Sequence, residues 1–167
     1  MELDLDTEMN LDDMDDDLLV IGDSQQYLFF ILAGDIYEID VNNISEMIEY
    51  QAITKVPLML PYIKGVTNVR GKIITVLDLR ERFGLGETKL NYKTSLVITN
   101  NIALIIDEVH EVTSVEESNL KESINFGVKI ERRFVKNMAS YNNTHIVILD
   151  CDEVLNIKEI SQKRASK

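Results

Sequence analysis

Residues 65–80 decide the fold, and they read Gly65-Val66-Thr67-Asn68-Val69-Arg70-Gly71-Lys72-Ile73-Ile74-Thr75-Val76-Leu77-Asp78-Leu79-Arg80. Two strand-like runs, residues 65–69 and 73–77, flank a short segment that contains Gly71. Glycine supplies the backbone freedom that a tight turn requires, so the stretch predicts a β-hairpin. Because the returning run is mostly apolar, we expect that strand to be buried on both faces.

A short helix is predicted directly after this hairpin. Asp78 can act as its N-cap, Glu81 follows three residues later, and Gly84 can end the helix in a left-handed conformation. These signals predict one to two helical turns.

A second hairpin is predicted upstream. Residues 27–32 form a strand-like run that ends at Ala33-Gly34-Asp35, and residues 37–41 alternate apolar and acidic side chains. Asn43 and Glu46 then have the spacing of a helix N-cap and its third-position acid. We therefore expect one or two helical turns near residue 43.

The second half of the chain repeats this pattern. Residues 117–131 are polar and irregular, and a short helix capped by Asp150 or Asp152 is expected near the end. Asn100-Asn101 forms a predicted turn of residues that tolerate a positive φ. Strands are predicted at residues 95–99, 103–107, 109–115, 134–140 and 145–149.

The overall pattern is therefore nine or ten short strands with frequent turn signals and only short helices. No long amphipathic helix is present that could form a βαβ unit. This spacing indicates an all-β fold, either a β-sandwich or small barrels.

The charge of the chain is concentrated at one end. Residues 1–23 contain ten of the 29 acidic side chains and no Lys or Arg, which leaves 19 acids against 17 bases elsewhere. A nearly neutral body lacks the basic excess that nucleic acids or anionic membranes attract, so we expect neither as a partner. No apolar run approaches the ~18 residues of a membrane span, and no secretory signal is evident.

Three segments are predicted from this composition: an acidic, disordered leader at residues 1–24, a folded body at 25–160 and a short basic tail at 161–167. A calcium loop beginning at Asp4 is disfavoured, since Met9 stands where the loop requires Gly and Asp15 where it requires Glu. The single cysteine, Cys151, excludes an internal disulfide and suits a reducing cytoplasm.

Catalytic motifs are scarce in this sequence. His110 and His145 belong to no metal-ligand spacing, and a lone Cys151 after an apolar strand is more typical of a core residue than of a nucleophile. No nucleophile elbow or phosphate-binding glycine loop appears. The chemistry therefore favours a binding module over an enzyme, with no cofactor and no metal expected.

The competing hypothesis is a small enzyme or ligand binder that uses Asp107, Glu108 and His110. The last two of these residues share one face of a strand.

The stretch at residues 56–80 resembles the hallmark segment of the CheW-type domains of bacterial chemotaxis. In that segment a proline and a spacer precede Gly-Val-x-Asn-(apolar)-Arg-Gly, a strand and Asp-Leu-Arg, as residues 65–80 do here. Further matches follow in order along the chain, at residues 27–31, 37–39, 44–48, 106–112, 146–150 and 154–155. The likeness covers about residues 25–158.

This resemblance implies two intertwined five-stranded β-barrels with short helices and a groove between them. It implies a non-catalytic adaptor that couples the cytoplasmic tips of methyl-accepting chemoreceptors to the regulatory domain of the histidine kinase CheA. Such an adaptor would be cytoplasmic and recruited to membrane-associated receptor arrays, without inserting into the membrane. The same fold could equally serve another receptor–kinase array, and the residues leave that choice open.

The resemblance also implies a receptor-binding surface, made of Ile44, Glu46, Gly65, Val66, Asn68, Val69, Arg70 and Gly71. In the family the groove uses the arginine at Arg70 together with the acid at Glu46, and an exposed Arg can pair bidentately with a carboxylate. Structural alternatives stay open: Glu46 could be only a capping acid, both glycines could serve the backbone, Asn68 could satisfy turn amides, and the two valines could belong to the core. The residues that contact the kinase are not identified by the sequence.

Overall fold

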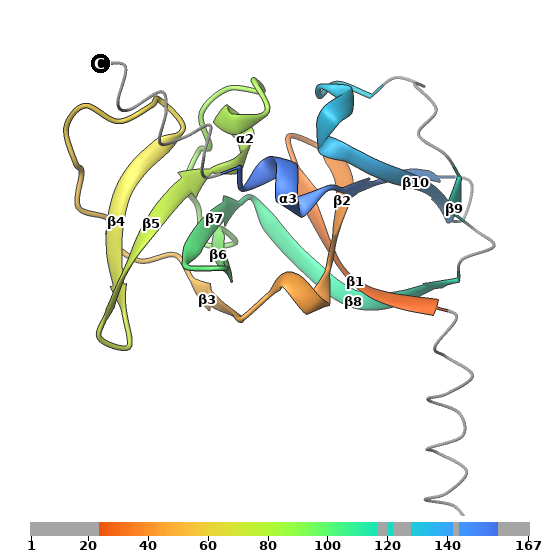
Figure 1. The fold of residues 1–167 in the computed structure, drawn as a ribbon, viewed down its shortest axis with the longest axis horizontal. Helices are drawn as coiled ribbons and strands as arrows, with labels where there is room; N and C mark the ends of the chain where they lie inside the picture. Colours follow the sequence, from red (N-terminus) through yellow and green to blue (C-terminus); the bar gives the residue numbers. More distant parts are fainter. Residues whose placement is uncertain (1–23, 117–119, 122–127, 142–143, 157–167) are drawn as a thin grey trace, which may run out of the picture.

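Two β-sheets make up the structure (Figure 1). A computed structural model of the chain describes residues 24–116, 120–121, 128–141 and 144–156. One sheet has six strands in the order β8-β1-β2-β11-β10-β9, and the other has five in the order β3-β6-β7-β5-β4. The strands of the larger sheet are β1 (Ser24–Leu32), β2 (Asp35–Asp40), β8 (Glu108–Glu116), β9 (Leu120–Lys121), β10 (Val135–Tyr141) and β11 (Thr144–Leu149). Those of the smaller sheet are β3 (Glu46–Glu49), β4 (Ile63–Val69), β5 (Lys72–Asp78), β6 (Ser95–Thr99) and β7 (Ile102–Ile106).

The chain crosses from one sheet to the other and back. It starts in the six-stranded sheet, builds the whole five-stranded sheet from β3 to β7, and returns to the first sheet at β8. The predicted all-β, intertwined architecture is confirmed. The larger sheet exceeds the expected five strands by the two-residue β9, which lies within the stretch that we expected to be irregular. The sheets are not the closed barrels that we expected: within the described residues each sheet has two end strands, and its strand pairing does not close on itself.

The hairpin at residues 65–80 forms as predicted. β4 and β5 pair antiparallel around Arg70 and Gly71, which have φ angles of +54° and +86°. Asp78 then caps the short helix α2 (Leu79–Arg82), since its Oδ1 accepts a hydrogen bond from the Arg80 N–H at 3.0 Å. The expectation that the returning strand is buried on both faces is wrong at Ile73, which is 66% exposed. Pairing of β5 with β7 begins only at Thr75, so Ile73 pairs with β4 alone.

The helix expected near residue 43 is also corrected. The chain forms a 3-10 turn, η2 (Val41–Asn43), capped by Asp40, and residues 46–49 are the strand β3. Glu46 and its successors pair antiparallel with β6, where Glu46 lies opposite Ile98. Pairing across the sheet therefore overrides the local capping signal.

The other local predictions agree with the structure. Asn100 and Asn101, at φ +44° and +67°, connect β6 to β7, and Asp150 caps α3 (Cys151–Val154). A 3-10 turn, η4 (Arg132–Phe134), precedes β10. Residues 1–23 of the acidic leader, the calcium loop considered at Asp4 and the basic tail lie outside the described residues, and Ser24 begins β1.

The core has three parts. The largest apolar cluster lies between the sheets and includes Phe30 and Tyr37 from one sheet and Leu77 and Leu104 from the other. A second cluster lies within the five-stranded sheet, and a third lies on the remaining face of the six-stranded sheet. Both sheets therefore bury a face in the same interior.

Candidate functional site

The predicted ion pair between Glu46 and Arg70 is formed. The Arg70 Nε–H donates to both carboxylate oxygens of Glu46 at 3.2 Å, and Nη2 lies 3.2 Å from Oε2. The arginine side chain is 77% exposed and the glutamate 29% exposed. The pair thus presents a charged group to solvent at the tip of the β4–β5 hairpin.

The ion pair belongs to a row of contacts between β3 and β4, the two end strands of the smaller sheet. Gln51, just after β3, donates through Nε2 to the Asn68 carbonyl at 2.7 Å and to the Thr67 hydroxyl at 2.8 Å. Thr54 forms an isolated bridge with Val66. The Glu46–Arg70 pair lies at one end of this row, so it also links the two sheet edges.

The two predicted glycines serve the backbone. Gly65 has φ +141°, and a Cβ there would lie 2.0 Å from the Thr54 carbonyl oxygen, too close for any side chain. Gly71 has φ +86°, and its N–H donates to Asn68 Oδ1 at 2.9 Å. Asn68 therefore satisfies a turn amide, which is the structural role considered for it above.

The predicted apolar positions divide by burial. Val69 is 8% exposed and belongs to the core cluster of the smaller sheet. Val66 and Ile44 are partly exposed. The sequence reasoning missed two exposed apolar side chains at this place: Ile73, opposite Asn68 in the hairpin, and Met47, next to Glu46. Met47 is 46% exposed.

The comparison with known families identifies the family of this chain. The family model of the CheW-like domain matches residues 26–159. The chain belongs to the CheW-like domain family.

Relatives in this family match along most of the chain. The Chemotaxis protein CheW of Bacillus subtilis is 32% identical over 147 residues, covering 85% of this chain and 93% of the relative. The Chemotaxis protein CheW of Thermotoga maritima is 30% identical over 127 residues, covering 74% and 82%. The crystal structure of the scaffolding protein TtCheW from Thermoanaerobacter tengcongensis superposes with a TM-score of 0.69 at 31% identity, covering 75% of this chain and 84% of that one.

The competing site around Asp107 is occupied by structural contacts. Asp107 Oδ2 accepts from Arg80 Nε at 2.9 Å and from the Ala33 N–H at 3.0 Å. Glu108 and His110 do meet, with Nε2 of the histidine 3.5 Å from Oε2 of the glutamate, but the histidine is 51% exposed. A solvated strand face accounts for this pair.

The remaining chemical groups give no further centre in the described part of the chain. Cys151 is buried, and burial raises the pKa of its thiol to about 12, which disfavours the nucleophilic thiolate. Among the residues that the structure describes, no group of three or more His, Cys, Asp and Glu side chains could hold a metal ion. In the same residues, no helix combines the length and apolar character needed to cross a membrane.

Proposed function

We propose that this chain is a non-catalytic adaptor that couples chemoreceptors to the histidine kinase CheA in chemotaxis signalling. The observation that carries the proposal is membership of the CheW-like family along residues 26–159, together with the 31% identical scaffolding protein. Its partners are the cytoplasmic tips of methyl-accepting chemoreceptors and the regulatory domain of the kinase. It acts in the cytoplasm, at membrane-associated receptor arrays.

The receptor-binding surface lies at the Glu46–Arg70 end of the five-stranded sheet. Arg70 offers an exposed guanidinium, and the partly exposed side chains of Ile44 and Val66 offer apolar contact. Gly65, Asn68 and Gly71 shape the backbone that presents Arg70, while Val69 supports the hairpin from inside. A charged group beside apolar surface on a rigid hairpin is suited to a protein partner.

Reconstitution tests the function. The full chain, the kinase CheA and a soluble receptor-tip fragment from the same organism are mixed, and the kinase is recovered on immobilised receptor tips. We expect the kinase to be retained only when this chain is present. Retention of the kinase at the same level without the chain would contradict the adaptor role.

Charge reversal at Arg70 tests the surface. Arg70→Glu places two carboxylates together and should reduce receptor-tip binding at least tenfold, measured by titration. Because an exposed pair contributes only about 0–1 kcal/mol to folding, the melting temperature should change little. Adding Glu46→Arg should restore part of the binding.

The matched control is Lys129→Glu, which reverses the charge of an exposed ion pair with Asp35 on the other sheet, where Lys129 Nζ lies 3.2 Å from Asp35 Oδ2. We expect normal receptor binding for this control. Equal loss of binding in both variants, or unfolding of Arg70→Glu, would refute the assignment of this surface.

A further inference from the structure

Glu38 is the most unusual ionisable group in the described structure. It lies on β2 with 0% exposure, and neither carboxylate oxygen has a hydrogen-bond partner. Its register neighbours are Phe29 on β1 and Ile148 on β11, two members of the apolar cluster on this face of the sheet. An unpaired carboxylate in such surroundings strongly favours its neutral form.

Glu38 lies where the two halves of the six-stranded sheet join. Among the described strands, the hydrogen bonds that join the halves β8-β1-β2 and β11-β10-β9 are those of the parallel pairing of β2 with β11, and the apolar clusters pack side chains from both halves against each other. That register contains two pairs, Tyr37 with Val147 and Glu38 with Ile148, whereas β1 and β2 share six. We call this junction the β2–β11 seam. One of its two register positions thus carries an unpartnered acid.

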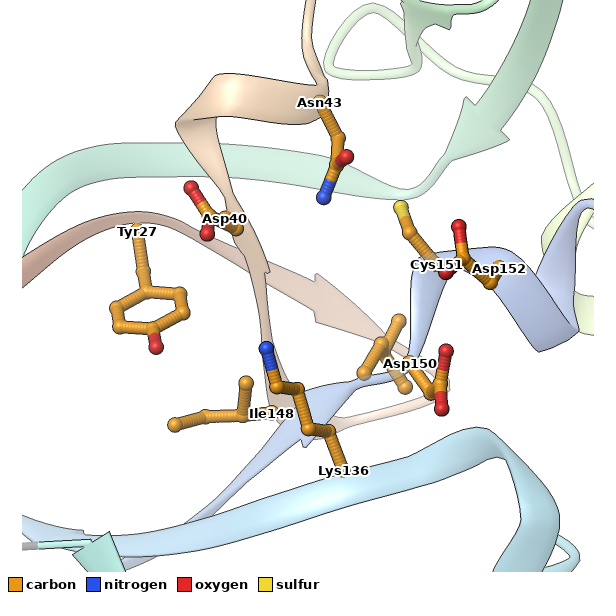
Figure 2. A pocket seen from close by; sticks show the side chains of 9 residues that line it. Tyr27, Asp40, Asn43, Lys136, Ile148, Asp150, Cys151 and Asp152 are labelled. Atoms are coloured by element: carbon orange, nitrogen blue, oxygen red, sulfur yellow. The ribbon is translucent and has the colours of Figure 1, made fainter.

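A cavity of about 280 Å³ crosses the same seam (Figure 2). Tyr27 and Asp40 line it from β1 and β2, and Lys136, Ile148 and Cys151 line it from β10, β11 and α3. Tyr27 and Ile148 also belong to the apolar cluster around Glu38. Ile148, the register partner of Glu38 on β11, therefore lines the cavity directly.

We propose that Glu38 is a proton-controlled latch of the β2–β11 seam. In its neutral form the side chain stays packed and the halves of the sheet stay joined. On ionisation it draws in water from the cavity, and the β10–β11 half separates from β1 and β2. This device is independent of the receptor surface, which lies on the other sheet.

The titratable and polar groups near Glu38 come from several elements. Tyr27 on β1 and Asp40 on β2 are close enough to interact electrostatically: burial raises the pKa of the Tyr27 phenol first, and the charges of Asp40 and Glu38 raise it further. Across the seam, β10 contributes the exposed Lys136, and Asp150 follows β11. On β8 the buried Thr113 hydroxyl also lacks a hydrogen-bond partner, and Glu111 is exposed.

The sign of the pH dependence follows from these surroundings. Burial raises the pKa of Glu38 from its ordinary value of 4.5 to about 8 in the folded chain. The closed seam therefore retains the proton more strongly than the open one, and the stability gained in this way is complete below 4.5 and is lost as pH rises to about 8. One released proton makes the opening constant rise about tenfold per pH unit in this window, with no further rise above it.

Thiol labelling measures the opening, because Cys151 is the only cysteine of the chain, is buried and lines the cavity. Labelling rates of the full chain and of Glu38→Gln are compared at each pH from 5 to 9, so that the intrinsic pH dependence of the thiol cancels. We expect the ratio of the two rates to rise about tenfold per pH unit up to about pH 8 and then to level off. The control variant Glu111→Gln removes an exposed carboxylate on β8, and the ratio of labelling rates between the full chain and this control should stay near one at every pH.

Urea unfolding at the same pH values separates local opening from global unfolding. If the urea midpoint of the full chain falls with pH relative to Glu38→Gln while the labelling ratio stays flat, Glu38 is titrated only on global unfolding and the latch is refuted. Flat curves in both measurements refute it as well. Should Glu38→Gln fail to fold, Glu38→Leu supplies the same non-ionisable comparison.

Discussion

At the residue scale, Arg70 stands in a position that local turn chemistry does not favour for arginine. Arg70 and Gly71 both have positive φ, the conformation for which Asn-Gly is preferred in a two-residue hairpin turn. A side chain with a Cβ loses about 1 kcal/mol in the left-handed region, and asparagine tolerates it better. The exposed ion pair with Glu46 offsets this only partly. Residues that break a local rule in this way are expected at functional sites.

This conflict predicts opposite effects on folding and on binding. Arg70→Asn should leave the free energy of unfolding unchanged or raise it by up to about 1 kcal/mol, since the turn gains its preferred residue while losing only an exposed ion pair. Receptor-tip binding should fall, because the guanidinium is lost. Urea denaturation and binding titration of the same preparation measure both. A variant that binds normally would show that Arg70 is not a contact residue.

At the scale of elements, the two short helices differ in what their caps support. Asp78 is 1% exposed and accepts three hydrogen bonds: Oδ1 from the Arg80 N–H and the Thr88 hydroxyl, and Oδ2 from the Thr88 N–H at 3.0 Å. Asp150 accepts one, from the Glu153 N–H at 3.3 Å. Asp78 therefore fixes both α2 and the loop that follows it.

The difference predicts a ranked loss of stability. Asp78→Ala leaves a buried amide and a hydroxyl unpaired and should lower the free energy of unfolding by about 3 kcal/mol, whereas Asp150→Ala should cost about 1 kcal/mol. Asp78→Asn keeps one acceptor oxygen, so its loss in free energy of unfolding should lie between those of the two alanine variants. Urea denaturation at pH 7 gives the order. Equal costs for the two alanine variants would mean that the Thr88 contacts contribute nothing.

Elements whose signal is local could be predicted from the sequence, and elements set by distant pairing could not. The residue types of Gly71 and Asn100 predict turns, and that of Asp78 predicts a helix N-cap. The structure confirms all three. At β3 the Asn43–Glu46 spacing satisfies a capping rule and predicts a helix, whereas pairing with β6 decides the conformation. The exposure of Ile73 depends on where β7 begins, which no local pattern contains.

The candidate site divides in the same way. The Glu46–Arg70 pair could be named in advance because a family resemblance supplied both positions, and the structure places them in contact. Spacing alone joins no residue of β3 to the β4–β5 turn. The contacts of Gln51 that connect these edges, and the exposed Met47 beside Glu46, required the three-dimensional pairing.

At the scale of the whole molecule, the two sheets behave as one packed unit. The strands of the smaller sheet lie, in sequence, between β2 and β8 of the larger one, and the largest apolar cluster contains side chains from both sheets. Arg82, 7% exposed at the end of α2, donates to the carbonyls of Val154 and Glu153 at 3.0 Å and lies over the rings of Tyr62 and Phe134. An adaptor that engages two partners needs surfaces in a fixed relation, and these shared contacts provide it.

This shared interior predicts that damage in one sheet destabilises both. Leu104 on β7 has 0% exposure and lies in the cluster between the sheets. Leu104→Ala should lower the free energy of unfolding by about 3 kcal/mol and leave a single cooperative transition. Slowly exchanging amides of β1 and of β5 should both lose protection, by similar factors, in hydrogen exchange.

The control variant is Val112→Ala, at an exposed position on β8, which should change the free energy of unfolding by less than about 0.5 kcal/mol. Loss of protection confined to β4–β7, or a two-step transition, would mean that each sheet folds on its own and that the shared cluster does not fix their relation.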